Sequence, residues 1–137
     1  MSLHYADTSA LVKLVLHESE TPQLLHWVRA EERTLVTCDL TRTELLRAVA
    51  RTAPTRTTRA RDVLASLTIV GLSAADFDAA GRLAPIALRS LDAIHLTVAL
   101  GLADELASVL TYDERMAAAA SALGLHVEAP GVDASFG

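Results

Sequence analysis

Short apolar runs alternate along this chain with segments whose apolar residues recur at helical spacing. The run at 3–6 is the first, and the segment 8–16 behind it carries its apolar residues three and four positions apart. The same alternation continues through the chain and predicts strands and helices in turn. Strands are expected at 3–6, 33–38, 67–72, 107–112 and 125–127, and helices at 8–16, from Thr21 onward, and at 41–53, 57–66, 74–88, 91–102 and 113–123.

Strands that alternate with helices predict an α/β fold. The expected architecture is a three-layer α/β/α sandwich with a mostly parallel sheet of four to five strands and right-handed crossovers. In such sheets, ligands bind at the carboxyl ends of the strands. The 137 residues fit a single domain, 1–137, whose small and polar end, 130–137, is expected to lie on the surface.

The segment 91–102 is apolar nearly all round, which predicts a helix buried inside the fold. Ser90 is expected to cap this helix, as Ser73 is expected to cap the helix before it. Because burial of an unpaired polar group is costly, the polar side chains Asp92, His95 and Thr97 on the buried helix need partners or a function.

The composition favours a soluble protein held together by aliphatic packing. Hydrophobic residues make up 51% of the chain and aromatic residues only 4%, so Leu, Val, Ile and Ala must fill the core. The single cysteine, Cys38, cannot form an internal disulfide, which favours a reducing compartment. No run is long and apolar enough to cross a bilayer, and the first residues lack the pattern of a signal peptide. We therefore expect a cytoplasmic protein without a membrane partner.

The net charge of −5 argues against a protein dedicated to nucleic-acid binding, but the basic residues are unevenly spread. Six arginines fall between positions 42 and 61. Two interpretations of this run stay open, a solvated helix face or a surface that contacts phosphate groups. On the second interpretation the contacts come first from Arg42, Arg47 and Arg51.

Four acids, Asp7, Glu44, Asp92 and Asp113, are the candidates for chemistry. Asp7 and Asp113 each follow an expected strand, where such a sheet places its ligand site. Each acid also has a local explanation. Asp7 and Asp113 can cap the helices that follow them, and Asp92 complements a helix dipole. Glu44 stands at the capping-box spacing from Thr41. As a set, the carboxylates suit Mg²⁺ or Mn²⁺, which prefer oxygen ligands.

His95 lies one turn beyond Asp92, at a spacing that allows a shared ligand pair. A hydrogen-bonded core position is the alternative interpretation for this side chain. The chain contains no dinucleotide-binding fingerprint, phosphate-binding loop or nucleophile elbow, and one cysteine excludes a cysteine-rich zinc site.

Four blocks of the sequence resemble the PIN-domain family, specifically the VapC-type toxins of bacterial toxin–antitoxin pairs. The blocks are Tyr5-Ala6-Asp7-Thr8-Ser9-Ala10-Leu11-Val12-Lys13-Leu14, Thr43-Glu44-Leu45, Leu91-Asp92-Ala93-Ile94-His95-Leu96 and Leu110-Thr111-Tyr112-Asp113-Glu114-Arg115-Met116. Each block is short, but their order and spacing are specific together and cover essentially the full length. The chain departs from the family pattern at Cys38-Asp39, where small hydroxyl residues are expected, so the role of Asp39 stays open.

The resemblance implies a metal-dependent endoribonuclease whose catalytic acids match the four candidates. Asp7 and Asp92 are expected to hold Mg²⁺, for which Mn²⁺ can substitute, with Asp113 and Glu44 bound directly or through water. Whether the site takes one ion or two stays open. The hydroxyls expected to support these carboxylates belong to Thr8, Ser9 and Thr111.

The resemblance also implies partners. These are an RNA substrate, a second copy of the chain in a homodimer, and a VapB-type antitoxin that blocks the acidic pocket with a basic side chain. The alternative is a catalytically inactive PIN-like module that binds RNA or a protein without cutting.

Overall fold

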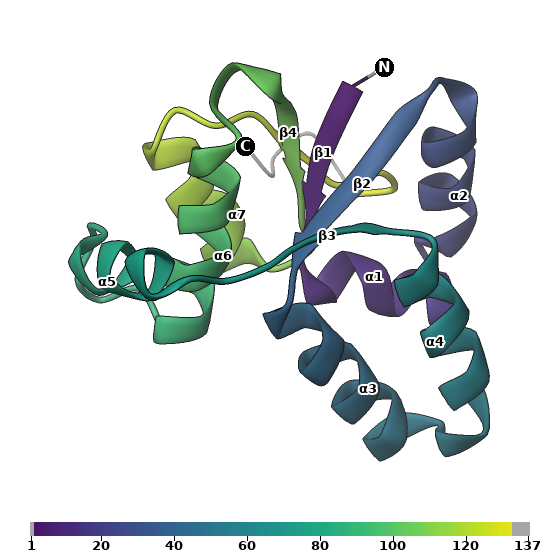
Figure 1. Ribbon diagram of the computed structural model, residues 1–137. Helices are drawn as coiled ribbons and strands as arrows, with labels where there is room; N and C mark the ends of the chain where they lie inside the picture. Colours follow the sequence, from purple (N-terminus) through teal and green to yellow (C-terminus); the bar gives the residue numbers. More distant parts are fainter. Residues whose placement is uncertain (1, 133–137) are drawn as a thin grey trace.

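The computed structural model describes residues 2–132, and its five strands form one parallel sheet in the order β3-β2-β1-β4-β5 (Figure 1). The strands are β1 (Ser2–Ala6), β2 (Arg33–Cys38), β3 (Thr68–Val70), β4 (Leu106–Leu110) and β5 (Val127–Glu128). Of the expected surface tail 130–137, positions 133–137 lie outside the described residues.

Helices cover both faces of the sheet, which confirms the predicted three-layer α/β/α sandwich (Figure 1). They are α1 (Thr8–Val15), α2 (Thr21–Ala30), α3 (Leu40–Thr52), α4 (Thr57–Ala65), α5 (Ala74–Arg82), α6 (Ser90–Gly101) and α7 (Glu114–Ala122), with single 3₁₀ turns at Pro54–Arg56 and Ala103–Glu105. Helices α1 to α4 lie against one face and α5 to α7 against the other. None of the helices in 2–132 is long and apolar enough to span a membrane.

One face of the sheet carries a fully buried aliphatic core. Leu11 of α1, Leu24 of α2 and Leu45 of α3 have no exposed surface, and they pack with Leu35 and Leu110 of the sheet. The amphipathic pattern of these helices places their apolar sides toward the strands, as the spacing predicts.

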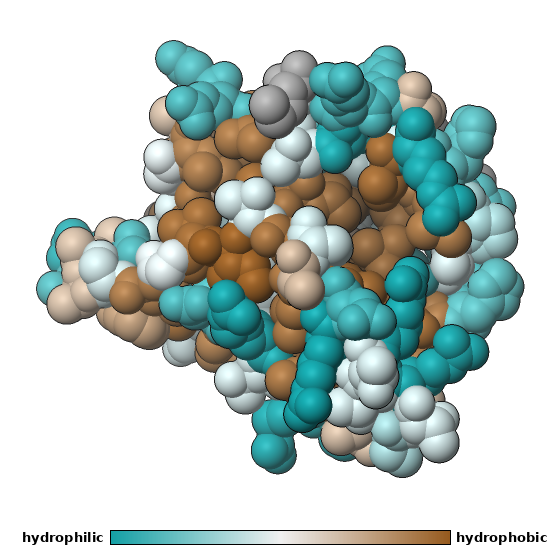
Figure 2. Space-filling model, turned by 45° about the vertical axis from the view of Figure 1, so that its right-hand side comes forward, coloured by the Kyte–Doolittle hydropathy of each residue, from teal (hydrophilic) through white to brown (hydrophobic). Residues whose placement is uncertain are grey.

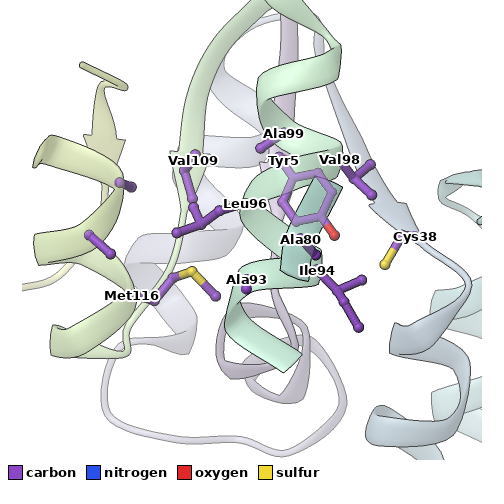
Figure 3. Packing of buried hydrophobic residues seen from close by; sticks show 12 residues of the cluster. Tyr5, Cys38, Ala80, Ala93, Ile94, Leu96, Val98, Ala99, Val109 and Met116 are labelled. Carbon is purple, nitrogen blue, oxygen red and sulfur yellow. The ribbon is translucent and has the colours of Figure 1, made fainter. Parts of the chain in front are cut away.

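The other face is built around α6, the helix predicted to be buried. Leu96 of α6, Val109 of β4 and Met116 of α7 pack together with the ring of Tyr5 (Figure 3). Cys38 lies at the edge of this cluster and is a free, buried thiol.

The single tryptophan, Trp27, lies toward the amino ends of β1 and β2. Trp27 of α2 packs edge to face on the ring of His4, with 4.8 Å between the ring centroids. The guanidinium of Arg33, the first residue of β2, lies 4.2 Å from the Trp27 ring centroid. The indole is therefore held between β1 and β2 at their amino-terminal half.

Several predicted strand boundaries shift by one or two residues, and two predictions at helix ends are wrong. The helix expected at 74–88 ends at Arg82, because Pro85 lacks an N–H group and disfavours a helical residue before it. Ser73 does cap this helix, and it forms a capping box with Asp76. Ser90 does not cap the next helix. Arg89 takes the extended cap position, and Ser90 is the first helical residue.

The surface between the helices keeps some hydrophobic side chains in solvent. Figure 2 shows hydrophobic residues in brown across the middle of the face in view, bordered by hydrophilic side chains in teal. The largest exposed ones include Ile86, which is 82% exposed, Phe77, which is 50% exposed, and Leu91, which is 47% exposed. Phe77 belongs to α5, Ile86 to the segment 83–89, and Leu91 to the start of α6.

Candidate active site

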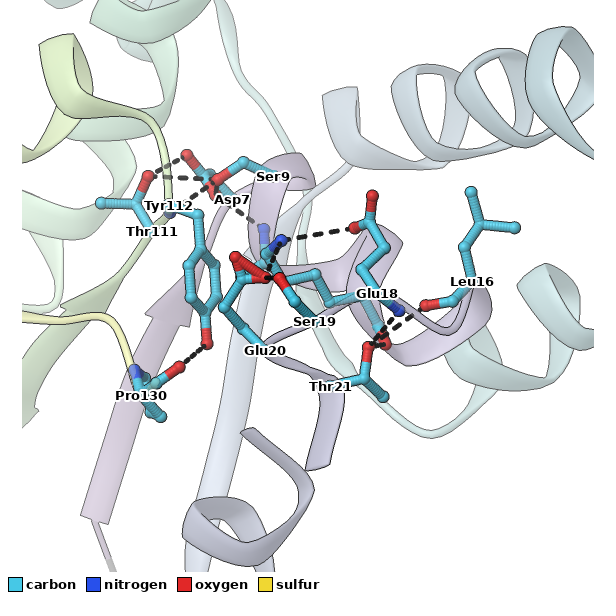
Figure 4. Close-up of polar contacts among 12 residues, drawn as sticks. Asp7, Ser9, Leu16, Glu18, Ser19, Glu20, Thr21, Thr111, Tyr112 and Pro130 are labelled. Atoms are coloured by element: carbon cyan, nitrogen blue, oxygen red, sulfur yellow. Dashed lines mark hydrogen bonds and ion pairs between the residues drawn. The ribbon is translucent and has the colours of Figure 1, made fainter. Parts of the chain in front are cut away.

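Asp7 follows β1 directly and caps α1, and both of its carboxylate oxygens are bonded. Oδ1 accepts from the backbone N–H of Ala10 at 3.2 Å and from the Ser9 hydroxyl at 2.6 Å. Oδ2 accepts from the Thr111 hydroxyl at 2.5 Å (Figure 4). Burial raises the pKa of Asp7 above the ordinary carboxyl value, although the Ser9 and Thr111 hydroxyls act against this shift.

The segment 111–113 joins Asp7 to Asp113 through hydroxyl groups. The Thr111 hydroxyl that donates to Asp7 also accepts from the backbone N–H of Asp113 at 3.1 Å. Asp113 in turn caps α7, since its Oδ1 accepts from the N–H groups of Arg115 and Met116. The capping roles predicted for Asp7 and Asp113 are both confirmed.

The buried Lys13 contacts this segment through Tyr112. The Lys13 ammonium lies 4.7 Å from the ring centroid of Tyr112 and forms ion pairs with Glu18 at 3.4 Å and Glu20 at 3.3 Å (Figure 4). The Tyr112 hydroxyl donates to the carbonyl of Pro130 at 2.7 Å. Contacts from α1 and from Pro130 therefore hold Tyr112, between Thr111 and Asp113.

Glu44 points from α3 toward α1 and α6. Its Oε1 accepts from the Thr8 hydroxyl at 2.8 Å and from His95 Nε2 at 2.7 Å. The capping-box alternative is wrong, because the Thr41 hydroxyl bonds to Thr37 at 2.6 Å. Glu44 therefore belongs to the same region as Asp7, whose helix α1 begins with Thr8.

His95 is buried, as the core interpretation predicts, and connects the core with the acids. Its Nδ1 lies 2.7 Å from the Tyr5 hydroxyl, and its Nε2 bonds Glu44. Burial alone lowers the pKa of His95, but hydrogen bonds with Cys38 and Glu44 outweigh burial and raise it to about 10. The imidazolium then donates from both ring nitrogens.

The ion pair that raises the pKa of His95 lowers the pKa of Glu44. Burial alone raises the pKa of Glu44, yet the hydrogen bond and charge of His95, helped by Thr8, bring that pKa below its ordinary value. Glu44 is therefore held as a carboxylate. The sequence pattern missed the part that Tyr5 plays here, although a tyrosine in a buried strand signals that its hydroxyl needs a partner.

Asp92 lies in the first turn of α6 and is less enclosed than Asp7. Its Oδ2 is 3.8 Å from Nε of Arg89. Burial raises the pKa of Asp92, and the negative charges of Asp113 and Glu44 raise it further. The fold thus gathers negative charge from α3, α6 and the start of α7 at the carboxyl edge of the sheet.

The gathered acids do not form a closed metal shell. Within 2–132, no three His, Cys, Asp or Glu side chains lie close enough together to hold one ion. Glu44 is tied to His95, and Asp7 to Ser9 and Thr111. The donor set is nevertheless made of carboxylate oxygens, the chemistry that Mg²⁺ and Mn²⁺ prefer. A cation would also relieve the repulsion that raises the pKa of Asp92.

Two of the three predicted arginines, Arg47 and Arg51, lie beside Glu44. A cavity of about 400 Å³ is lined by Glu44, Arg47 and Arg51 of α3, and Leu91 of α6 forms part of its wall. Arg42 is not among its lining residues and instead forms an exposed ion pair with Asp39 at 3.1 Å. Asp39 is thus bonded to its own helix, at the carboxyl end of β2.

Comparison with known proteins finds one family and several relatives. The PIN domain family model matches residues 5–122. A protein named Ribonuclease VapC47 from Mycobacterium tuberculosis is 40% identical over 131 residues, covering 93% of this chain and 96% of its own. Ribonuclease VapC46 from the same species is 38% identical over 130 residues, covering 95% of this chain and 99% of its own.

Solved structures share the fold at lower identity. The crystal structure of Mycobacterium tuberculosis VapC20, described as a toxin that cleaves the sarcin-ricin loop, matches with a TM-score of 0.70 at 14% identity and covers 89% of this chain and 95% of its own. VapBC2 from Rickettsia felis, bound to a promoter DNA fragment, matches with a TM-score of 0.65 at 17% identity, covering 92% of this chain and 97% of its own.

Proposed function

Because this chain belongs to the PIN domain family, we propose that it is a divalent-metal-dependent endoribonuclease that acts in the cytoplasm as the toxin of a toxin–antitoxin pair. The observation that carries the proposal is the meeting of the acids at the sheet edge. Glu44, Asp92 and Asp113 come from separate elements, yet the charges of Asp113 and Glu44 add to burial in raising the pKa of Asp92.

The proposed ion is Mg²⁺, with Mn²⁺ as a substitute. Asp7 and Asp92 would hold it, with Asp113 and Glu44 reaching it directly or through water. Magnesium keeps several waters and usually takes only one or two carboxylates from the protein. An open arrangement, in which no three side chains in 2–132 close on one point, is therefore compatible with such an ion. Whether one or two ions bind is decided by titration.

The chain's own residues position the reaction. Ser9 and Thr111 fix the Asp7 carboxylate in one orientation, and His95 fixes that of Glu44. Arg47 and Arg51 lie next to Glu44, where they can bind the phosphates of an RNA chain. When bound, Mg²⁺ supplies an activated water and stabilises charge on the phosphodiester.

The partners follow from the same family. We propose a VapB-type antitoxin that places a basic side chain among the acids, and a homodimer of this chain. The acids attract such a side chain because their charges are only partly balanced by Arg89 and His95. Co-expression with the candidate antitoxin should abolish cleavage, and size-exclusion chromatography with light scattering should give twice the chain's mass.

The test is cleavage of total cellular RNA by the purified protein with Mg²⁺, Mn²⁺ or EDTA. Cleavage should require the ion, and Asp7→Asn and Asp92→Asn should each reduce the rate at least a hundredfold, roughly the size of one lost electrostatic contact in an active site. Asp78→Asn, an exposed acid of α5, is the matched control and should cut normally. RNA binding without cleavage would instead support the inactive RNA-binding module.

A further inference from the structure

A second cavity is lined by Asp92, whose neighbour Leu91 lines the cavity with Arg47 and Arg51. The volume of this second cavity is about 430 Å³. One wall is the segment 83–89, with Pro85 and Leu88, and the other is the surface of α7. Asp92, one of the four acids, and its ion-pair partner Arg89 also line the cavity.

The walls of this cavity are mainly apolar. On α7 the apolar part of the wall consists of alanines, Ala118, Ala119 and Ala122, and Arg115 lines the cavity at the start of the same helix. Methyl side chains leave room for an occupant about as wide as a flat ring. Pro85 and Leu88 supply apolar surface on the opposite side, so a ring between the walls would lose water on both of its faces.

The rim carries positive charge. Arg89 and Arg115 line the cavity together with one acid, Asp92. Arg89 is exposed and lies 3.8 Å from Asp92, too long for a tight ion pair, and Arg115 is exposed at the start of α7. The occupant therefore combines an apolar planar part with negative charge beside it.

A nucleotide of single-stranded RNA has that chemistry. We infer that the cavity between 83–89 and α7 takes one nucleobase of the substrate, next to the phosphodiester at the acids, while Arg89 and Arg115 contact its phosphates. The inference rests on the proposed ribonuclease function, and it adds the position at which the protein binds a nucleobase.

The two cavities together define a path for the strand. Leu91 lines the cavity with Arg47 and Arg51, and the next residue, Asp92, lines the cavity with Arg89 and Arg115. A strand that runs from one cavity to the other past Leu91 and Asp92 therefore meets a pair of arginines in each. To enter the cavity beside the alanines of α7, a base must be unstacked and unpaired. The substrate is therefore expected to be single-stranded at this nucleotide.

The test fills the cavity without adding an aromatic ring. The double variant Ala118→Leu/Ala122→Leu occupies the α7 wall, and Ser121→Leu adds the same side chain at an exposed position of α7 outside the cavity. Arg115→Ala removes one rim charge, and Arg29→Ala, an exposed arginine of α2, is its control. Thermal unfolding first confirms that all variants are folded.

Binding of fluorescent single-stranded RNA hexamers is then measured by anisotropy in EDTA and in Ca²⁺, so that no cleavage is needed. One set of hexamers carries an abasic nucleotide at each position in turn. The wild type should lose about tenfold in affinity at one abasic position, the usual size of one lost base contact. The filled variant should bind every hexamer about tenfold more weakly than wild type does and lose the abasic difference. Arg115→Ala should bind more weakly than Arg29→Ala.

Three results overturn the inference. These are no RNA binding by the wild type, equal binding by the filled variant and Ser121→Leu, and an unchanged RNA affinity in a filled variant that no longer binds its antitoxin or forms a dimer. The last result would assign the cavity to a protein partner. A wild type that binds hexamers but cuts no RNA with Mg²⁺ or Mn²⁺ would refute the proposed ribonuclease while leaving the base pocket standing.

Discussion

Helices α1 to α3 bury Leu11, Leu24 and Leu45 completely on one face of the sheet, whereas the other face leaves Phe77, Ile86 and Leu91 in solvent. The first face has the continuous core expected of a stable domain. The second has α6 as its core and an open cavity between 83–89 and α7. The acids lie where the two faces meet. The first face therefore contributes mainly to stability, and the second adds the cavity that we propose takes a base.

The largest effect should come from the closed face. Leu45→Ala removes a side chain with no exposed surface from the centre of that core and should lower the free energy of unfolding by about 3 kcal/mol. Urea denaturation measures this change. A loss under 1 kcal/mol would mean that this face collapses around the gap and is less rigidly packed than the other.

His95 is the next largest, because it joins the two faces. His95→Phe leaves the Tyr5 hydroxyl and Glu44 without their partner and should cost about 2 kcal/mol. His95→Gln, which keeps a donor, should cost less. Urea denaturation of both variants at the same pH gives the comparison. A smaller loss for His95→Phe than for His95→Gln would show that ring volume, rather than the hydrogen bonds, is what the site needs.

A substitution at Asp7 should raise the free energy of unfolding rather than lower it. The pKa of Asp7 is raised on folding, so the folded state must release a proton at a cost as the pH rises above the ordinary carboxyl range. Asp7→Asn removes this cost and keeps an oxygen for the Ala10 N–H. The variant should therefore be more stable than the wild type by about 1 kcal/mol at pH 7. The difference should shrink as the pH falls toward 4 and vanish below it. Denaturation across this range checks the sign, and a variant less stable than wild type at pH 7 would contradict it.

The smallest effect belongs to the open face. Ile86→Ser removes an 82% exposed side chain and should change the free energy of unfolding by less than about 0.5 kcal/mol. Thermal unfolding is sufficient as a measurement. A large loss would mean that Ile86 is covered in solution, for example by a second copy of the chain.

Much of the fold follows from local signals. The strand 33–38 was predicted to the residue, since a β-branched run is bounded by polar positions on both sides. Asp7 and Asp113 were predicted as caps because a cap depends only on the three residues that follow it. Thr8, Ser9 and Thr111 were predicted to support the acids, and their hydroxyls do bond Glu44 and Asp7.

The part that could not be predicted depends on distant contacts. Glu44 stands three residues after Thr41, and this local spacing favours a capping box that the structure does not contain. Its actual partner, His95, lies 51 residues away, and Tyr5 lies 90 residues from His95. Only the tertiary packing of α3, α6 and β1 brings them together. The early end of α5 at Arg82, by contrast, was readable from Pro85.

The position of Trp27 has a practical consequence for spectroscopy. Because it is the only tryptophan and packs on the closed face, between His4 and Arg33, its emission reports on α2 and the amino-terminal half of β1 and β2. The open face is silent to this probe, while far-ultraviolet circular dichroism sees helices on both faces. Coincident denaturation curves from the two signals would show that the faces unfold as one cooperative unit. An earlier dichroism transition would show that α5 and its neighbours loosen first, before the emission shifts.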